Sequence, residues 1–376
     1  MGAGVTEHVH RRTRIGVLFG GRSGEHDVSL RSAESIMRAL DPERYEVVPI
    51  GITREGRWLR SPDPLRELQS GTPAHMEMAI LADPGARGLV TFDVGGPIAA
   101  SEREAPLDVV IPALHGPYGE DGTIQGLLEI ADVPYVGAGV LGSALGMDKA
   151  LMKTVLRAAG IPVIDWVSFR VHEWAARPDA IIVDVEATCA YPCFVKPANL
   201  GSSVGITKAS DEDELRAAID FALTFDRKVI VERAAIDCRE IECSVLGNQM
   251  PIASVLGEIV PDRDWYDYDA KYANSKTELI IPAQVSPAVS DRVRAMAVDT
   301  FKAIDCEGMA RVDFFVARDE LAVWVNELNT IPGFTSISMF AKLWEATGLD
   351  YPKLLDELIR LAIERHGTRS RLKTGR

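Results

Sequence analysis

Cysteine and long apolar runs are both scarce in this chain. Its 376 residues contain only five cysteines, and an odd number without a C-x-x-C pair predicts neither a disulfide framework nor a structural zinc site. No apolar run approaches the ~20 residues that cross a bilayer, and the residues up to Arg14 lack the apolar segment of an export signal. We therefore expect a cytoplasmic protein without a membrane partner. The cysteines are Cys189, Cys193, Cys238, Cys243 and Cys306.

Basic residues are fewer than acidic ones. There are 41 Lys and Arg against 55 Asp and Glu, a formal net charge of -14. This balance argues against a general binder of nucleic-acid backbones and leaves room for local sites that hold a small anion. Hydrophobic residues make up 47% of the chain, which is enough for an ordinary core, and the length predicts two or three domains.

The first third of the chain alternates between strand and helix patterns. We expect strands at 15–19, 47–52, 109–114 and 133–136, with helices at 30–40 and 124–130. This alternation predicts an α/β domain with a parallel sheet over residues 14–141, after a disordered leader at 1–13. Residues 61–104 are rich in Pro, Gly and Ala, and there we expect a surface excursion with at most one short hairpin.

The remaining residues predict two α+β domains, a central one at 142–235 and a C-terminal one at 236–366, followed by a basic tail at 367–376. Aromatic residues mixed with Asp, Asn and Lys at 262–277 are typical of a mobile lid. Strands are expected at 163–167, 194–196, 229–232, 240–246, 252–255, 309–316 and 322–328, and helices at 142–156, 211–223, 287–304, 338–347 and 351–365.

A hairpin at 310–330 carries the strongest chemical signal. If its turn centres on Glu320, Asp313 lies directly across from Glu327, and Asn329 shares the face of Glu327. Two neighbouring carboxylates repel each other unless a cation intervenes, and an amide adds a neutral oxygen ligand. Asp313, Glu327 and Asn329 therefore predict a magnesium site. The alternative is a solvated polar face, which the apolar back face of the hairpin and the nearby Arg311 disfavour.

A second signal follows an expected strand that ends at Lys196. The loop Gly201-Ser202-Ser203-Val204-Gly205 is small and carries hydroxyls, so its amides and side chains can donate to phosphate oxygens while Lys196 supplies a positive charge. No Walker P-loop occurs in the chain. Together with the magnesium site, the loop predicts a nucleotide-binding protein.

A competing motif is the segment from Gly137 to Gly142, which matches the dinucleotide fingerprint G-x-G-x-x-G. It favours an oxidoreductase that binds NAD. However, the fingerprint normally opens the first strand–helix–strand unit and has an acidic residue at the end of the next strand. Here the next strand has Asp165 in its interior, so this alternative is the weaker one.

Several segments together resemble one family. They are GGRSGEHDVS, ALHGPYGEDG, GMDK, VKPANLGSSVG, YDAKY, ARVDFF and NELNTIPGFT. From about residue 14 to 365 the chain resembles the D-alanine–D-alanine ligases of the ATP-grasp superfamily. The resemblance implies three domains, with ATP clamped between two antiparallel sheets. It also implies that one D-alanine carboxylate attacks the γ-phosphate of ATP, and that a second D-alanine attacks the acyl phosphate, for peptidoglycan precursor synthesis.

The resemblance implies a role for each matching residue. At the nucleotide, Lys149 and Lys196 would hold phosphates, Glu232 would face adenine and Glu240 ribose, with Ser203 and Lys271 also in contact. Asp313, Glu327 and Asn329 would ligate two Mg²⁺ (or Mn²⁺) ions. Glu25, with His115 close by, would hold the first D-alanine, Arg311 and the Gly333 amide the oxyanion, and Ser338 the second carboxylate. Tyr272 would bond to Ser202 and so link the lid to Glu25.

The second substrate stays open between D-alanine, D-serine and D-lactate. Tyr272 counts against D-lactate, because relatives that use it typically lack this lid tyrosine, but it decides less about D-serine. The resemblance also implies a homodimer. A departure from the family pattern is Cys238, where glycine is common, and it leaves the ribose contact of Glu240 open.

Overall fold

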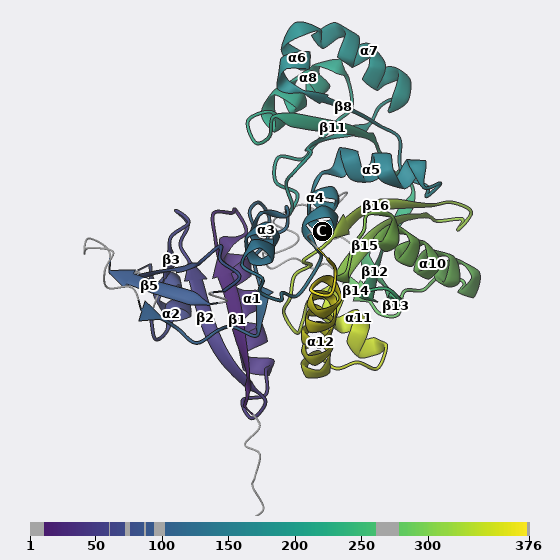
Figure 1. Ribbon diagram of the computed structural model, residues 1–376. Coiled ribbons are helices and arrows are strands. Elements are labelled where there is room, and N and C mark those ends of the chain that lie inside the picture. The colour runs from purple at the N-terminus through teal and green to yellow at the C-terminus, as the bar shows by residue number, and fades with distance from the viewer. Residues whose placement is uncertain are drawn as a thin grey trace, which may run out of the picture.

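Three sheets organise the chain. The computed structural model describes residues 11–59, 61–71, 76–85, 88–93, 102–260 and 278–373. Figure 1 shows the N-terminal sheet in purple and blue, a small central part in teal, and a C-terminal part in green and yellow. The expected combination of an α/β part with α+β parts is confirmed.

The N-terminal sheet has seven strands in the order β6-β5-β4-β3-β2-β1-β7. It is parallel only where β1 pairs with β2 and β7; the other pairs are antiparallel. The prediction for 61–104 is therefore wrong in part. The expected hairpin is present as β4 and β5, but together with β6 it extends the sheet and is not a surface excursion. Weak periodicity hid buried residues such as Met78 and Leu89. The bounds are β1 (Thr13–Gly20), β2 (Tyr45–Ile52), β3 (Trp58–Leu59), α2 (Pro64–Ser70), β4 (Met76–Ile80), β5 (Leu89–Asp93), β6 (Glu102–Arg103) and β7 (Val109–Pro112).

Helices cover both faces of β1, which explains its unbroken apolar run. Ile15 and Val17 belong to the core that also contains residues of α1 (His26–Ala39), whereas Leu18 belongs to the core that contains residues of α3 (Thr123–Ile130). The expected strand at 133–136 does not form, since only Tyr135 makes a bridge, to Val110.

The central sheet is antiparallel, in the order β10-β9-β11-β8. The single helix expected at 142–156 is two helices, because the Asp148 carboxylate accepts a hydrogen bond from the Leu151 amide and starts a new one. α6 and α7 were not predicted. The bounds are α4 (Val140–Met147), α5 (Lys149–Ala158), β8 (Trp166–Arg170), α6 (Val171–Ala176), α7 (Pro178–Thr188), β9 (Cys193–Pro197), β10 (Thr207–Ala209), α8 (Glu212–Ala222) and β11 (Lys228–Arg233).

The C-terminal sheet is antiparallel as well, in the order β14-β13-β12-β15-β16. Its last helix extends to Arg369, so the tail predicted at 367–376 begins inside a helix. The bounds are β12 (Cys238–Gly247), β13 (Ile252–Val260), β14 (Glu278–Ile280), α10 (Pro287–Ala303), β15 (Gly308–Ala317), β16 (Val323–Asn329), α11 (Met339–Ala346) and α12 (Tyr351–Arg369).

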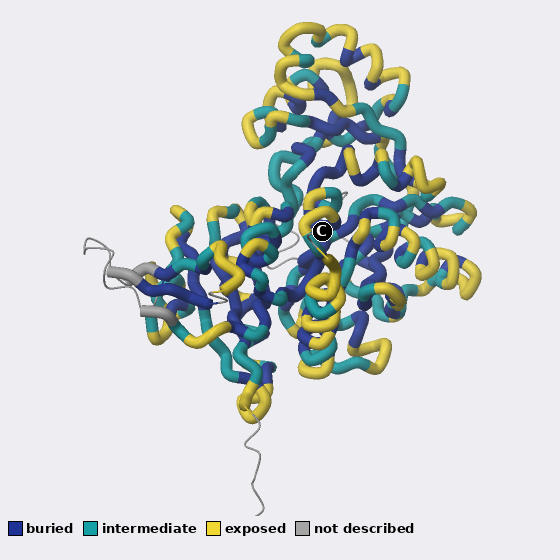
Figure 2. The backbone as a smooth tube through the Cα atoms, viewed as in Figure 1, coloured by how far each residue is buried: buried dark blue, intermediate teal, exposed yellow. Residues whose placement is uncertain are grey.

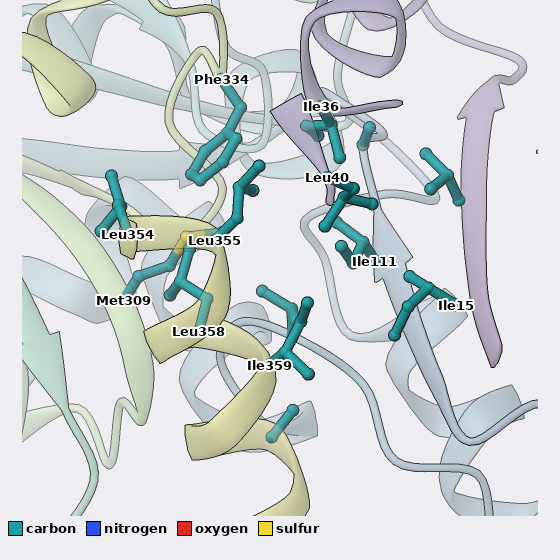
Figure 3. Packing of buried hydrophobic residues seen from close by; sticks show 14 of the residues in the cluster. Ile15, Ile36, Leu40, Ile111, Met309, Phe334, Leu354, Leu355, Leu358 and Ile359 are labelled. Atoms are coloured by element: carbon teal, nitrogen blue, oxygen red, sulfur yellow. The ribbon is translucent and has the colours of Figure 1, made fainter. Parts of the chain in front are cut away.

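One apolar cluster joins the N-terminal and C-terminal parts. Figure 3 shows Leu355, Leu358 and Ile359 of α12 facing Ile15 and Ile111 of the first sheet. Figure 2 shows that buried positions follow the strands, while the outer helix faces are exposed. This shared core holds the carboxyl ends of β1 and β7 close to the loop after β16. Within the described ranges, no helix has the length and apolar character to cross a membrane.

Candidate active site

Charged and amide side chains line one face of the β15–β16 hairpin. Asp313 pairs in register with Glu327, and Arg311 pairs with Asn329. On its other edge β15 pairs with β12, which sets Glu242 opposite Asp313. Since alternate residues share a face, these side chains form two adjacent rows. The predicted opposition of Asp313 and Glu327 is confirmed.

Arg311 lies between two carboxylates. Its Nε and Nη2 donate to the two oxygens of Asp313, each at 2.7 Å, and Nε lies 2.9 Å from Glu242 Oε2. Burial alone would lower the pKa of Arg311, but Asp313 and Glu242 outweigh it and raise the pKa well above its usual value. Asn329 Nδ2 also donates to Asp313 Oδ2, at 3.0 Å. The guanidinium is thus a fixed positive charge beside the predicted metal ligands.

Lys149 connects this hairpin to the loop after β9. It is the first residue of α5, and its Nζ donates to the Leu200 carbonyl at 2.6 Å while lying 3.7 Å from Glu327 Oε2. Its backbone N–H donates to the Ala198 carbonyl at 3.0 Å. A cation therefore bridges the Gly/Ser loop and the acidic row.

Lys196 is part of a buried charge cluster. Its Nζ lies 2.5 Å from Glu232 Oε2, and Lys153 Nζ lies 3.0 Å from Glu232 Oε1. Burial alone would raise the pKa of Glu232, but the charges of the two lysines lower it to about 2. Glu232, which the resemblance placed at adenine, has its carboxylate directed at two lysines of the same cluster.

The Gly/Ser loop reaches the N-terminal part of the chain. Ser202 Oγ donates to the buried carboxylate of Glu25, which lies just before α1. Two glycines allow this approach: a Cβ on Gly116 would lie 2.7 Å from Glu25 Oε2, and one on Gly201 would lie 3.1 Å from it. This contact is the Ser202–Glu25 part of the link expected from the resemblance, whose Tyr272 part falls outside the described residues.

His115 is buried at the end of β7. Its Nε2 lies 2.9 Å from Ser32 Oγ, and its Nδ1 lies 3.1 Å from the Ile331 carbonyl and 3.6 Å from Glu120 Oε1. Burial alone would lower the pKa of His115, but the hydrogen bond and charge of Glu120 outweigh it and raise the pKa. His115 therefore joins the first sheet to the loop that follows β16.

That loop carries Gly333 and Ser338. The Phe334 amide donates to Ser32 Oγ at 3.4 Å, and the Ser338 hydroxyl donates to the Thr335 carbonyl at 2.7 Å. Ser338 is the residue before α11, and its Cβ would lie 4.0 Å from a Cβ on Gly333. The loop thus places both residues beside the N-terminal part of the site.

Comparison with known proteins decides the family. Residues 14–138 match the model described as D-ala D-ala ligase N-terminus, and residues 155–360 match D-ala D-ala ligase C-terminus. The chain belongs to the D-alanine–D-alanine ligase family. It is 48% identical over 366 residues to the D-alanine–D-alanine ligase of Natranaerobius thermophilus, covering 97% of this chain and 98% of the relative. The D-alanine–D-alanine ligase of Geobacillus kaustophilus is 46% identical over 363 residues. This match covers 94% of this chain and 96% of the relative.

Solved ligases share the fold of this family member. The D-alanine–D-alanine ligase of Coxiella burnetii is 38% identical, with a TM-score of 0.81 and 96% of each chain covered. The VanG D-Ala:D-Ser ligase of Enterococcus faecalis is 35% identical, also with a TM-score of 0.81, and covers 94% of this chain and 100% of its own. The expected ATP-grasp fold is confirmed.

The G-x-G-x-x-G motif has a packing role in this ligase-family chain. A Cβ on Gly142 would lie 2.9 Å from the Asp305 carbonyl, and one on Gly308 would lie 3.0 Å from the Gly137 carbonyl. These glycines let α4 approach the residues before β15. Close packing at Gly142 and the left-handed φ of 99° at Gly137 account for two of the three glycines without a dinucleotide.

The other predicted residues are placed unequally. Glu240 lies on β12, two residues before Glu242 and on the same face of the strand. Ser203 lies in the Gly/Ser loop and has a left-handed φ of 59°. Lys271, Tyr272 and the lid at 262–277 fall outside the described residues. All five cysteines are free thiols, so no disulfide joins them.

Three residues in contact with the predicted set were not singled out from the sequence: Lys153, Glu242 and Glu120. Lys153 stands four residues after Lys149, and Glu242 two after Glu240, so helix and strand spacing place each on the face of a predicted residue. Glu120 stands within the His115 motif. For Lys153 and Glu242, the spacing from a predicted site residue was the sequence signal that could have identified them.

Proposed function

We propose that this chain joins two D-alanines at the expense of ATP to form D-alanyl-D-alanine. The observation that carries the proposal is one continuous set of charges: the Asp313–Glu327 row, Lys149 lying 3.7 Å from Glu327, and Lys149 bonded to the loop after β9. This arrangement suits a polyphosphate that lies between the central and C-terminal sheets, because cations and metal ligands then face its oxygens together.

The donor set suits magnesium. Asp313 and Glu327 supply carboxylate oxygens and Asn329 an amide oxygen, while Mg²⁺ commonly takes one or two protein carboxylates and completes its shell with phosphate and water. When bound, the ions would neutralise the charge that develops on the transferred phosphoryl group.

The amino-acid substrates would occupy the space between Glu25 and the loop after β16. The Glu25 carboxylate would pair with the ammonium of the first D-alanine, with His115 behind it. Arg311 and the Gly333 amide would stabilise the oxyanion that forms when the second amine attacks the acyl phosphate. Ser338 would donate to the carboxylate of the second D-alanine, and Lys196 would hold the phosphates.

D-serine is a second candidate for the accepting amino acid. The specific observation is the similarity to the VanG D-Ala:D-Ser ligase, at 35% identity and a TM-score of 0.81. The two reactions share the phosphoryl transfer and differ only in the second amino acid. The two activities therefore differ in whether the site accepts the side-chain hydroxyl of D-serine in the second amino acid.

The test measures ADP and phosphate release with Mg²⁺-ATP and D-alanine, with L-alanine as the control, and identifies products by mass. D-alanine should support release and yield D-alanyl-D-alanine. Equimolar D-alanine with D-serine or D-lactate should still yield mainly that dipeptide. A predominant D-alanyl-D-serine product would move the chain to the second candidate, and no release with D-alanine would refute the proposal.

We also propose that the ligase works in the cytoplasm as a homodimer, as the family resemblance implies. Light scattering of the full chain should give twice the mass of 41.0 kDa. A monomeric mass over the concentrations of the activity assay would refute this assembly.

A further inference from the structure

A fully buried lysine links the central and C-terminal sheets behind the candidate nucleotide site. Lys153 lies on α5, about one turn after Lys149, and is buried. Its Nζ lies 3.0 Å from Glu232 Oε1 and donates a hydrogen bond of 3.0 Å to the Asn326 carbonyl. Glu232 belongs to β11 and Asn326 to β16, directly before Glu327. The contact therefore joins the two sheets between which the nucleotide is expected.

Within the ion-paired set of Lys153, Lys196 and Glu232 the charges do not cancel. Lys153 and Lys196 share the single carboxylate of Glu232, which gives the three side chains a net charge of +1. Of the three, Lys196 is the most accessible: its side chain is 12% exposed, against 1% for Lys153 and 4% for Glu232. Charges interact strongly where water is excluded. Of these three side chains, Lys196 therefore brings the excess positive charge nearest to the phosphate site, where the charges of Glu327 and Glu240 also act on it.

Removal of the Lys153 charge would change this balance. Glu232 would then pair with Lys196 alone, and the net charge of the cluster would fall to zero. A phosphate group would then compete with the Glu232 carboxylate for Lys196. No second lysine would neutralise part of the Glu232 charge. Replacing Glu232 by a neutral residue in the same chain would return a net positive charge to Lys196.

We propose that Lys153 is a positioning residue for ATP: it pairs with Glu232 so that Lys196 keeps a net positive charge for the phosphates. The inference rests on the proposed use of ATP. Lys153 touches no substrate in this account and acts through Glu232. Its hydrogen bond to the Asn326 carbonyl also holds β16, and with it Glu327, at a fixed distance from the central sheet.

The experiment compares nucleotide binding by the full chain and its variants, using calorimetry with a non-hydrolysable ATP analogue and Mg²⁺. Lys153→Gln removes the charge and retains a donor for the Asn326 carbonyl. It should weaken binding by about tenfold or more, as expected for the loss of a close charge interaction. In steady-state assays, the KM for ATP should rise more than kcat falls. Lys208→Met, an exposed lysine of the same sheet, is the matched control and should bind as the wild type does.

The double variant Lys153→Gln/Glu232→Gln distinguishes charge balance from support of the fold. It should bind the analogue more tightly than Lys153→Gln alone, because no carboxylate then neutralises Lys196. If Lys153→Gln does not fold by circular dichroism, the double variant is compared with Glu232→Gln. Because both variants lack the carboxylate through which Lys153 acts, they should bind the analogue within about threefold of each other.

Two results would overturn the inference. One is unchanged binding by folded Lys153→Gln. The other is a double variant that binds no better than Lys153→Gln or, where that variant is unfolded, far more weakly than Glu232→Gln. A wild-type protein that binds no analogue would instead refute the proposed function. The two failures are therefore distinguishable.

Discussion

Arg311 holds Asp313 through two parallel hydrogen bonds, from Nε to Oδ1 and from Nη2 to Oδ2, each 2.7 Å long. The same guanidinium lies 2.9 Å from Glu242, so it has a second carboxylate partner. We expect Glu242 to keep Arg311 in place when Asp313 binds a cation. One side chain could then orient a metal ligand and remain available for the oxyanion.

Asp313→Ala and Glu327→Ala should each abolish ATP-dependent turnover without unfolding the chain. Each change removes a predicted metal ligand, while Glu242 still pairs with Arg311. Turnover is measured by ADP release, and folding by circular dichroism. Asp319→Ala, in the exposed turn of the same hairpin, should be unaffected. Normal turnover in both site variants would rule out the metal assignment.

Ser202→Ala should lower kcat/KM for D-alanine by about tenfold, because the buried Glu25 carboxylate loses a hydroxyl donor, and a hydrogen bond to a charged group contributes about 1.5–3 kcal/mol. The KM for ATP should change less. Initial rates at varied D-alanine and saturating ATP measure the effect, with the exposed Ser210→Ala as the control. An effect confined to ATP would show that the hydroxyl serves the nucleotide instead.

His115 should titrate above the usual histidine pKa of 6.5. Glu120 stabilises the charged imidazole and outweighs burial, so the proton is lost only as the pH rises past 6.5. Glu120→Gln removes that charge, and the pKa of His115 should then fall. NMR of labelled histidines gives both titrations, with His115→Gln identifying the resonance. An unshifted resonance in Glu120→Gln would contradict the assigned cause.

Arg365→Met should destabilise the fold by about 2–4 kcal/mol. The buried guanidinium of Arg365 donates to the carbonyls of Gly137 and Tyr135, and so ties α12 to the segment before α4. Urea unfolding measures the loss. The exposed Arg360→Met on the same helix should cost far less, and equal losses would show that helix propensity rather than the buried contact is responsible.

The hairpin chemistry was predictable from the sequence because it depends on local geometry. Alternation along two strands and one turn sufficed to set Asp313 against Glu327. The contact between Ser202 and Glu25 spans 177 positions, and no local pattern encodes it. It was expected only from the family resemblance, which supplied the missing long-range information.

Other parts of the fold escaped prediction for physical reasons. Among the described residues of 61–104, buried positions such as Met78 and Leu89 do not form a regular strand pattern, and the strands are held by pairing with their neighbours. Tyr135 makes a bridge to Val110, but its neighbours at 133–136 make no ladder. Lys153 escaped because a lysine on an amphipathic helix is ordinarily exposed, and only the arrangement of three elements shows that it is enclosed.

The most direct test of the account follows one oxygen atom. D-alanine with ¹⁸O in its carboxylate is supplied with Mg²⁺-ATP, and the released phosphate is examined by mass. Attack of the carboxylate on the γ-phosphate leaves that oxygen in the phosphate when the second amine displaces it, so the account predicts one ¹⁸O in phosphate for each dipeptide formed. Dipeptide formation with unlabelled phosphate would contradict it.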